Sequence, residues 1–340
     1  MTEPRSNLNR REFIQAGAAG LAATALVVPT AAAQEKTPGG IPLRPLGRTG
    51  EKVSMLALGG FHAAVPENEA DSIRLIQRAF DEGITFFDNA WDYMDGKAEE
   101  RMGKAISQGG RRDKIFLMTK CCGRTAREAQ SNLEDSLRRL QTDRIDLWQF
   151  HEINYDNDPE WVFQQGGALE FALKAKEQGK VRYLGFTGHK HPEIHLKMLA
   201  RPFEWATVQM PLNIMDTHYR SFQKQVLPVL NQRGIAPLGM KSLGGFGNIV
   251  KNTGIPVEDA LRYVFSLPIA SLVSGIDSEK VLDQNLKIAR EFTPMTGDEV
   301  AALEAKALPH AGDGRLELFK STQVFDGVAH RKQHGFAGGT

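Results

Sequence analysis

Short apolar runs alternate with amphipathic segments along most of this chain, and this alternation constrains the fold more than any other feature. Runs that predict strands occupy residues 54–59, 85–88, 114–120, 145–150, 182–186, 207–210, 235–240 and 271–274. Each run precedes a segment with apolar residues at helical spacing. Strands that alternate with helices pair in parallel through right-handed crossovers. Eight such units predict a closed (β/α)8 barrel, the TIM barrel, with its helices outside.

Further elements are predicted at both ends of this alternation. Residues 43–46 and 53 flank a Gly-Arg-Thr-Gly turn, which predicts an N-terminal β-hairpin. Helices are expected at 99–106, 192–199 and 223–232, and an additional C-terminal helix at 297–307, followed by a polar tail. The alternative is an open doubly wound sheet, but no G-x-G-x-x-G joins an early strand to a helix, and the glycine-rich stretch 244–247 comes too late.

The first 33 residues are predicted to be an export signal. Arg10 and Arg11 precede an apolar stretch at 16–28, and three alanines at 31–33 offer a cleavage site. This pattern resembles a twin-arginine signal, whereas an amphipathic first helix would need a polar face. We therefore divide the chain into a signal (1–33), a linker (34–40), the barrel (41–310) and an irregular C-terminal tail (311–340). The expected location is periplasmic, or cytoplasmic without the signal, and the expected partner is the twin-arginine export machinery.

Composition narrows the function. The net charge of +1 and the lack of a basic run argue against nucleic-acid binding, and no stable membrane insertion of the mature chain is expected. The two cysteines, Cys121 and Cys122, are adjacent, which suits neither a disulfide framework nor a metal site. We interpret them as reduced thiols, with a redox-sensitive pair beside Lys120 as the alternative.

Four polar residues stand at or just beyond the ends of neighbouring strands. Asp88, Lys120 and His151 each close an apolar run, and Tyr93 lies five residues past Asp88. Because the carboxyl ends of parallel strands meet at one edge, these side chains are expected to converge. A carboxylate, an ammonium, an imidazole and a phenol in one cleft predict a proton-transfer site.

The chemistry expected of this set is proton transfer to or from an oxygen. Lys120 can pair with Asp88 and lie near Tyr93, where its charge is expected to lower the pKa of the phenol from about 10. His151 can hydrogen-bond to a carbonyl oxygen. No side chain supplies two electrons, so a cofactor must. Taken singly, each residue also has an ordinary interpretation. Asp88 could cap a loop, Lys120 could be solvated at a strand end, Tyr93 could pack on Trp91, and His151 could be a core imidazole.

At this point the chain resembles the aldo-keto reductase family, from about residue 43 to residue 285. The resemblance is carried by the Asp-Asn-Ala-Trp-Asp-Tyr stretch at 88–93, by Lys120 and His151, and by Gly-Lys-Val-Arg-Tyr-Leu-Gly at 179–185. It implies that Tyr93 is the general acid/base, that Lys120 tunes it, that Asp88 holds Lys120 and that His151 orients the carbonyl. It also implies hydride transfer from NADP(H) or NAD(H) to an aldehyde, ketone or sugar.

The resemblance also implies where the cofactor would bind. Gln209 matches the family residue that holds the nicotinamide carboxamide, whereas Gly188 replaces the usual Asn and His189 could compensate. Met240 can cover the nicotinamide ring, and Lys241 can reach the pyrophosphate. The full set of expected contacts is Thr187, Gln209, Met240, Lys241, Gly244, Gly275, Asp277, Ser278, Gln284 and Asn285.

The choice between the two cofactors is open. The family often places a basic residue after the eighth strand to bind the 2′-phosphate of NADP(H). Here Asp277 and Glu279 bring negative charge, and Lys280 is the only nearby cation. A carboxylate repels a phosphate and suits a free ribose hydroxyl.

Two other functions compete with an oxidoreductase. A nucleotide-loaded sensor or partner-binding subunit would keep the fold with little turnover. A metal-dependent hydrolase is disfavoured because His151 is the only well-placed imidazole, whereas His189, His191 and His195 fall in one loop and helix; no metal is expected. Trp91, Asp92 and residues 154–165 are expected to line the substrate pocket.

Overall fold

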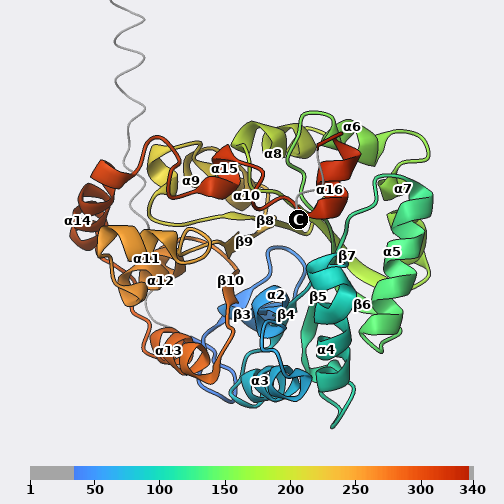
Figure 1. Ribbon diagram of the computed structural model, residues 1–340, viewed down its shortest axis with the longest axis horizontal. Coiled ribbons are helices and arrows are strands. Elements are labelled where there is room, and N and C mark those ends of the chain that lie inside the picture. The colour runs from blue at the N-terminus through green and yellow to red at the C-terminus, as the bar shows by residue number, and fades with distance from the viewer. Residues whose placement is uncertain (1–33, 337–340) are drawn as a thin grey trace, which may run out of the picture. The chain divides into compact units, whose positions relative to one another are not determined.

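The computed structural model describes residues 34–336, so the predicted export signal lies outside the described residues. Eight parallel strands close into a barrel in the order β10-β3-β4-β5-β6-β7-β8-β9, which confirms the TIM-barrel prediction (Figure 1). The strands are β3 (Leu56–Gly59), β4 (Phe86–Asp88), β5 (Phe116–Cys121), β6 (Ile145–Phe150), β7 (Val181–Thr187), β8 (Thr207–Pro211), β9 (Ala236–Met240) and β10 (Ser271–Gly275).

Helices surround the barrel and cover the outer face of its strands (Figure 1). Local sequence explains their ends: Asn68 caps the first long helix by accepting from the Ala70 amide, and Gly83 beyond its end adopts φ +98°. The helices of the barrel layer are α2 (Gly60–Ala63), α3 (Glu69–Asp81), α4 (Lys97–Ile106), α5 (Ala126–Arg139), α6 (Asp158–Phe163), α7 (Ala168–Glu177), α8 (Pro192–Leu199), α9 (Phe222–Gln225), α10 (Leu227–Gln232), α11 (Asn248–Thr253), α12 (Val257–Ser266) and α13 (Glu279–Arg290).

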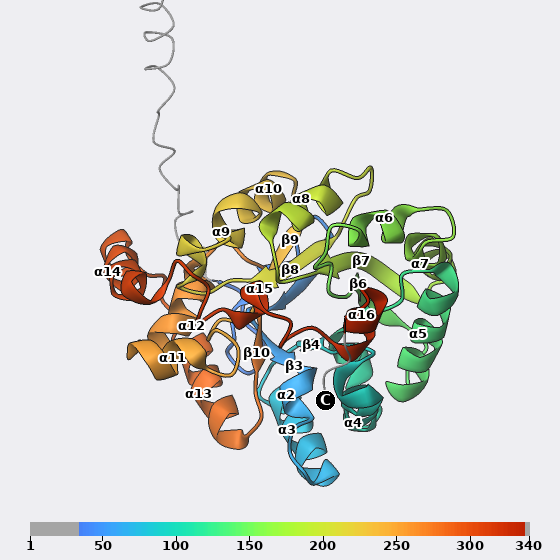
Figure 2. The ribbon, with the colours of Figure 1, turned by 45° about the horizontal axis from the view of Figure 1, so that its top comes forward.

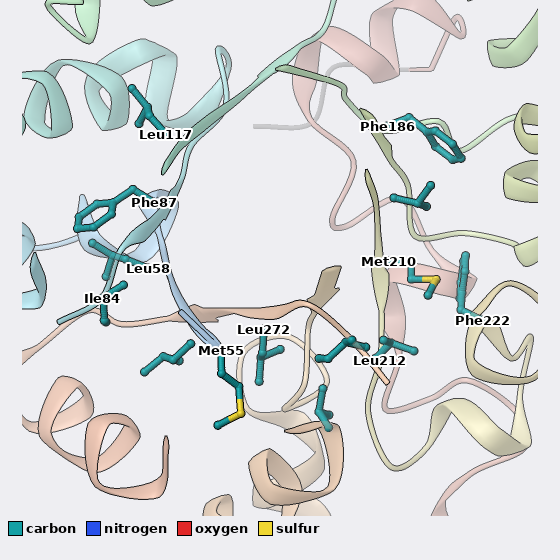
Figure 3. Packing of buried hydrophobic residues seen from close by; sticks show 14 of the residues in the cluster. Met55, Leu58, Ile84, Phe87, Leu117, Phe186, Met210, Leu212, Phe222 and Leu272 are labelled. Carbon is teal, nitrogen blue, oxygen red and sulfur yellow. The ribbon is translucent and has the colours of Figure 1, made fainter. Parts of the chain in front are cut away.

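The period of two along each strand divides the side chains between two cores. Phe87 and Leu117 point outward toward the helices, as does Phe186 (Figure 3). Phe86 and Phe116 belong instead to the cluster inside the barrel, where their rings meet edge-on at 5.4 Å. The residue two positions beyond an inward-facing apolar residue also faces inward, which is how the strands deliver polar groups to the barrel mouth.

A hairpin closes the amino-terminal end of the barrel. Strand β1 (Leu43–Pro45) pairs antiparallel with β2 (Lys52–Ser54), as predicted. Leu46 and Val53, both fully buried, join the inner cluster and fill the base of the barrel.

Two predictions about the second half of the chain are wrong. The helix expected at 223–232 is broken at Val226 into α9 and α10, because Pro228 lacks an amide hydrogen and fits only in a first helical turn. The tail expected to be irregular from residue 311 contains two helices, α15 (Leu318–Ser321) and α16 (Val328–Gln333), after the predicted α14 (Gly297–Ala307).

The C-terminal segment, residues 311–336, crosses the carboxyl ends of the barrel strands. Figures 1 and 2 show α15 and α16, in red, over the mouth of the barrel rather than at its side. Phe319, Lys320 and His330 of this segment are at most 1% exposed, so it is part of the packed structure. Among the described residues, no helix combines the length and apolar character that crossing a membrane requires.

Candidate active site

The structure brings Lys120, Asp88 and Tyr93 together at the barrel mouth. Lys120 follows Phe116 and Met118 on the inward face of β5, and Asp88 follows Phe86 on β4. The Lys120 ammonium pairs with Asp88 and donates to the Asn89 carbonyl at 2.7 Å, and its Nζ lies 3.3 Å from the Tyr93 hydroxyl. Lys120 and Asp88 are 1% and 3% exposed, whereas Tyr93 is half-buried.

The pKa of Tyr93 runs against the expectation from the sequence. Burial raises the pKa of Tyr93 well above its usual value, and the charges of Asp88 and Asp92 raise it further. The expected lowering by Lys120 is wrong for this structure, because Asp88 neutralises the ammonium at close range. Tyr93 is therefore a neutral phenol, the form that can donate a proton.

His151 lies beside Tyr93, with the two rings edge-on and their centroids 5.5 Å apart. Its Nδ1 is 3.1 Å from Asp92 Oδ1 and 3.5 Å from the Cys122 sulfur. Burial lowers the pKa of His151, although Asp92 opposes the shift, so the imidazole is neutral near pH 7. Nε2 makes no hydrogen bond with the described residues, which leaves this nitrogen for a ligand.

Two residues that directly follow or nearly follow barrel strands hold unusual backbone angles. Glu152 and Lys241 have φ +49° and +57°, in the left-handed region that non-glycine residues rarely adopt. Residues in this region persist only where the surrounding structure holds them, and they are often found at functional sites.

The backbone amide of Gly327 in the C-terminal segment donates to both carboxylate oxygens of Glu152, at 3.0 and 3.1 Å.

The residues expected at the nicotinamide end of the cofactor lie together. Thr187 and Gln209 are paired in register on β7 and β8, and the Thr187 hydroxyl is 4.0 Å from the Met240 sulfur on β9. Gln209 is 1% exposed, yet its Oε1 has no hydrogen-bond partner among the described residues. A buried acceptor without a donor fits the amide hydrogens of a carboxamide.

The expected pyrophosphate site lies under the C-terminal segment. The Lys241 ammonium is 5.1 Å from the centre of the Phe325 ring, and burial lowers the pKa of Lys241 to about 8. Gly244 has φ +81°, and a Cβ there would lie 2.9 Å from the Leu316 carbonyl oxygen. The C-terminal segment therefore packs directly against the residues expected to bind the pyrophosphate.

The loop after β10 is more open. Asp277 is exposed, whereas the charge of Glu279 is taken up by Arg78 on α3. Asn285 is buried and donates to the Ser274 hydroxyl at 2.9 Å, so its amide already has a structural partner. The remaining expected contacts in this region are Gly275 at the end of β10, Ser278 at the N-cap of α13, and Gln284, which donates to Asn285.

Asp326 anchors the C-terminal segment, and the sequence did not single it out. The carboxylate accepts from the Tyr155 hydroxyl at 2.6 Å and lies 3.0 Å from His189 Nε2 and 2.8 Å from Lys190 Nζ. His189, expected to help bind the cofactor amide, is thus engaged by the tail. The sequence does carry apolar residues through this segment, among them Leu316, Phe319 and Phe325.

A second imidazole stands beside His151. The rings of His151 and His330 are 5.2 Å apart and meet edge-on, so the expectation that His151 is the only well-placed imidazole is wrong. Trp91, expected to line the pocket, donates from its indole to Asp135 on α5 at 3.1 Å, so its polar edge faces that helix.

Comparison with known proteins agrees with this geometry. Residues 55–259 match the model of the Aldo/keto reductase family. The chain is 32% identical over 314 residues to L-galactose dehydrogenase of Arabidopsis thaliana, a match that covers 79% of this chain and 94% of that protein. It is 31% identical over 223 residues to the uncharacterized oxidoreductase YrpG of Bacillus subtilis, covering 59% of this chain and 66% of YrpG.

Solved structures support the fold. The holo form of the aldo-keto reductase AKR11C1 from Bacillus halodurans superposes with a TM-score of 0.66 at 24% identity, covering 78% of this chain and 96% of that one. The family match extends over most of the barrel, including the strand ends that carry Asp88, Lys120 and His151. The chain therefore belongs to the aldo/keto reductase family, whose members are NAD(P)H-dependent oxidoreductases.

Proposed function

We propose that this protein interconverts a carbonyl and an alcohol with NAD(P)H, and that Tyr93 is its general acid/base. One observation carries the proposal: the half-buried Tyr93 hydroxyl lies 3.3 Å from the ammonium of a Lys120 held by Asp88. Carbonyl reduction needs a proton donor near the forming alkoxide and a cation to stabilise the anion left on the donor. This arrangement provides both.

A raised pKa of Tyr93 is compatible with this role. A bound nicotinamide cofactor would supply the hydride, and the alkoxide oxygen of the reduced substrate is a much stronger base than a phenolate. The neutral phenol of Tyr93 can therefore donate its proton as the alkoxide forms. Lys120 stabilises the phenolate that remains. His151 Nε2 can serve the substrate in either tautomer: it accepts from an alcohol hydroxyl when Nδ1–H faces Asp92 Oδ1 at 3.1 Å, and it donates to a carbonyl oxygen when the hydrogen is on Nε2.

For the cofactor, we propose NADP(H) or NAD(H), with at most a modest preference for NADPH. The negative charge of the exposed Asp277 disfavours a 2′-phosphate. Glu279 adds little to this repulsion, because it pairs with Arg78. Steady-state kinetics with both nucleotides should give kcat/KM values within about tenfold of each other, about 1.4 kcal/mol. A thousandfold preference for NADPH would contradict this reading of Asp277.

For the substrate, we propose a sugar or a small aldehyde. One relative with high coverage is named an L-galactose dehydrogenase, and another, from Escherichia coli, is named an L-glyceraldehyde 3-phosphate reductase at 26% identity. The polar groups around Tyr93, among them Asp92 and His151, suit a substrate with several hydroxyls.

The test is turnover of a panel of sugars, aldehydes and ketones, followed by nicotinamide absorbance, for the wild type and Tyr93→Phe. We expect Tyr93→Phe to lower kcat by about 10²–10⁴-fold, because a positioned proton donor contributes that much, while nucleotide affinity changes little. Tyr183→Phe is a matched control, since Tyr183 lies at the other end of the barrel interior beside Glu51. Tight nucleotide binding without turnover on any substrate would favour the sensor instead.

We also propose that the protein is exported through the twin-arginine route. The support is the paired Arg10 and Arg11 before an apolar stretch and an alanine-rich cleavage site. Residues 1–40 fused to a reporter should direct it out of the cytoplasm, and replacing both arginines by lysine should keep it inside. A reporter that stays in the cytoplasm with the native arginines would refute the proposal.

A further inference from the structure

Four potential metal ligands converge at one edge of the barrel mouth. Asp92, Cys122, His151 and His330 each offer one ligand atom, and these four atoms all lie within 4.8 Å of one another. Three of the residues follow barrel strands, whereas His330 belongs to α16 in the C-terminal segment, far from the other three in sequence. The cluster therefore exists only because the C-terminal segment crosses the mouth.

The spacing suits a tetrahedral ion. Bonds of about 2.3 Å to sulfur and about 2.0–2.2 Å to nitrogen and oxygen put neighbouring tetrahedral ligands about 3.3–3.6 Å apart. His151 Nδ1 is 3.5 Å from the Cys122 sulfur and 3.1 Å from Asp92 Oδ1. The cluster needs shifts of only a few tenths of an ångström along these two edges to accept such an ion.

Two atoms of the cluster lack partners that their burial would normally demand. Neither Asp92 Oδ1 nor His330 Nε2, both buried atoms, makes a hydrogen bond to a described residue, although His151 Nδ1 lies 3.1 Å from Asp92 Oδ1 without the geometry of one. Buried polar atoms are nearly always satisfied, so each of these two calls for an explanation. A cation between them would satisfy an acceptor oxygen and an imidazole lone pair at once.

The charges around the cluster allow a divalent ion. Arg124 lies beside the cluster, with Nη2 3.5 Å from His330 Nδ1, but it pairs with the fully buried Asp158 at 2.9 Å. With Cys122 as a thiolate, its proton released to solvent, the two anionic ligands balance the two charges of the ion. Arg124 opposes binding at the His330 side, so affinity is expected in the micromolar range rather than that of a dedicated zinc site.

We propose that Asp92, Cys122, His151 and His330 bind a divalent transition-metal ion of the Zn²⁺ type. Sulfur and imidazole ligands select zinc and its neighbours over Mg²⁺ or Ca²⁺. The ion ties α16 to the loops after β4, β5 and β6, so it clamps the C-terminal segment over the mouth. Bound at His151 Nδ1, it leaves Nε2–H as the only tautomer, the one that donates to a carbonyl; this link to turnover rests on the proposed function.

Cobalt titration of the metal-free protein tests the site directly. One equivalent of Co²⁺ should produce the visible bands of a tetrahedral ion together with sulfur-to-cobalt charge transfer in the near ultraviolet, and Zn²⁺ should abolish both. Cys122→Ser should remove the charge-transfer band. Cys121→Ser is the matched control, because the adjacent thiol is equally buried but faces the Gly123 carbonyl and Asn132, and it should bind Co²⁺ as the wild type does.

Thermal unfolding gives a second readout that needs no turnover. Zn²⁺ at about 100-fold excess over its Kd should raise the Tm of the wild type by about 4 °C, and that of His330→Ala by much less. Equal metal-free Tm values would show that the variants fold. Absence of cobalt charge transfer in the wild type, or its loss in Cys121→Ser but not in Cys122→Ser, would overturn the proposal. These outcomes do not depend on the effect of Tyr93→Phe, so the metal site and the proposed function can fail separately.

Discussion

The two ends of the barrel interior differ in the inward-facing side chains that the strands carry, which are apolar at the base and charged at the mouth. Along β5 the inward face carries Phe116 and Met118 near the base and then Lys120 at the mouth, and along β4 it carries Phe86 and then Asp88. The apolar residues at the base stabilise the fold, at roughly 1.5–3 kcal/mol for each fully buried large side chain. The charged residues at the mouth oppose it, since burial raises the pKa of Asp88 despite its ion pair with Lys120.

The two ends are also closed differently. The base is closed by the hairpin β1–β2, whose residues are close in sequence to the strand they cover. The mouth is closed by residues 311–336, which follow all eight barrel strands in the sequence. The centre of the base is therefore apolar, with polar contacts such as Arg44 to the Ile269 carbonyl, whereas order at the mouth depends chiefly on polar contacts between distant parts of the chain, such as Asp326 with Tyr155.

The largest expected effect tests whether the mouth serves chemistry rather than stability. Lys120→Met should lower kcat by about 10²–10³-fold and the unfolding free energy by about 3–5 kcal/mol, because Asp88 is left buried without its cation. The double variant Lys120→Met/Asp88→Asn should regain most of the stability but none of the turnover. Urea unfolding and steady-state kinetics measure both, and turnover restored in the double variant would contradict this division of roles.

The converse test is Leu147→Ala at the base, on the inward face of β6 two positions before Gln149. Loss of a fully buried Leu should cost about 2–5 kcal/mol of unfolding free energy. Turnover per folded molecule should change by no more than about twofold. A large loss of kcat in correctly folded Leu147→Ala would mean that packing at the base affects the geometry of the site at the mouth.

Asp326→Asn tests how the mouth is held closed. Burial alone would raise the pKa of Asp326, but hydrogen bonds from His189 and Lys190 lower it overall. A lowered folded pKa contributes stability above the unfolded value of about 3.9, and the contribution is lost as pH falls below it. The variant should therefore be less stable by about 1–3 kcal/mol at pH 7, with a smaller difference at pH 3. Asp313→Asn, exposed in the same segment, should change little at either pH.

The smallest effect concerns Lys241, whose pKa is lowered to about 8 chiefly by burial. Its ammonium should attract the cofactor pyrophosphate below pH 8 and lose its charge above it. The Kd of NADH should then rise by up to about tenfold between pH 7 and pH 9.5, and Lys241→Met should show the weaker binding at both pH values. Lys174→Met, at an exposed position of α7, is the control. A pH-independent Kd in the wild type would remove Lys241 from the cofactor site.

Much of the fold could be predicted because it follows from local patterns. The inward turn of Asp88, Lys120 and His151 follows from the period of two along strands whose ends the sequence marks clearly. The single helix predicted at 223–232 is instead two helices, α9 and α10, that meet at Val226. Pro228 was a local signal for this break, but the helical spacing of the apolar residues outweighed it in the prediction.

The C-terminal segment could not be predicted in the same way, because its order comes from its partners. Lys320 is fully buried only because Asp216 and Glu317 accept from it at 2.7 and 2.9 Å. Glu317 is only three positions away, but Asp216 is 104 positions away, so without the fold a lysine followed by polar residues looks like part of a solvated tail.

By itself, then, the sequence determined the barrel and the end of the barrel where the polar residues meet, since both depend on alternation within a few residues. Only the tertiary structure decided that Tyr93 stays a neutral phenol, that Asp326 holds the tail across the mouth, and that His330 comes to rest beside His151. These depend on burial and on electrostatic contacts between segments far apart in the chain, which local spacing does not encode.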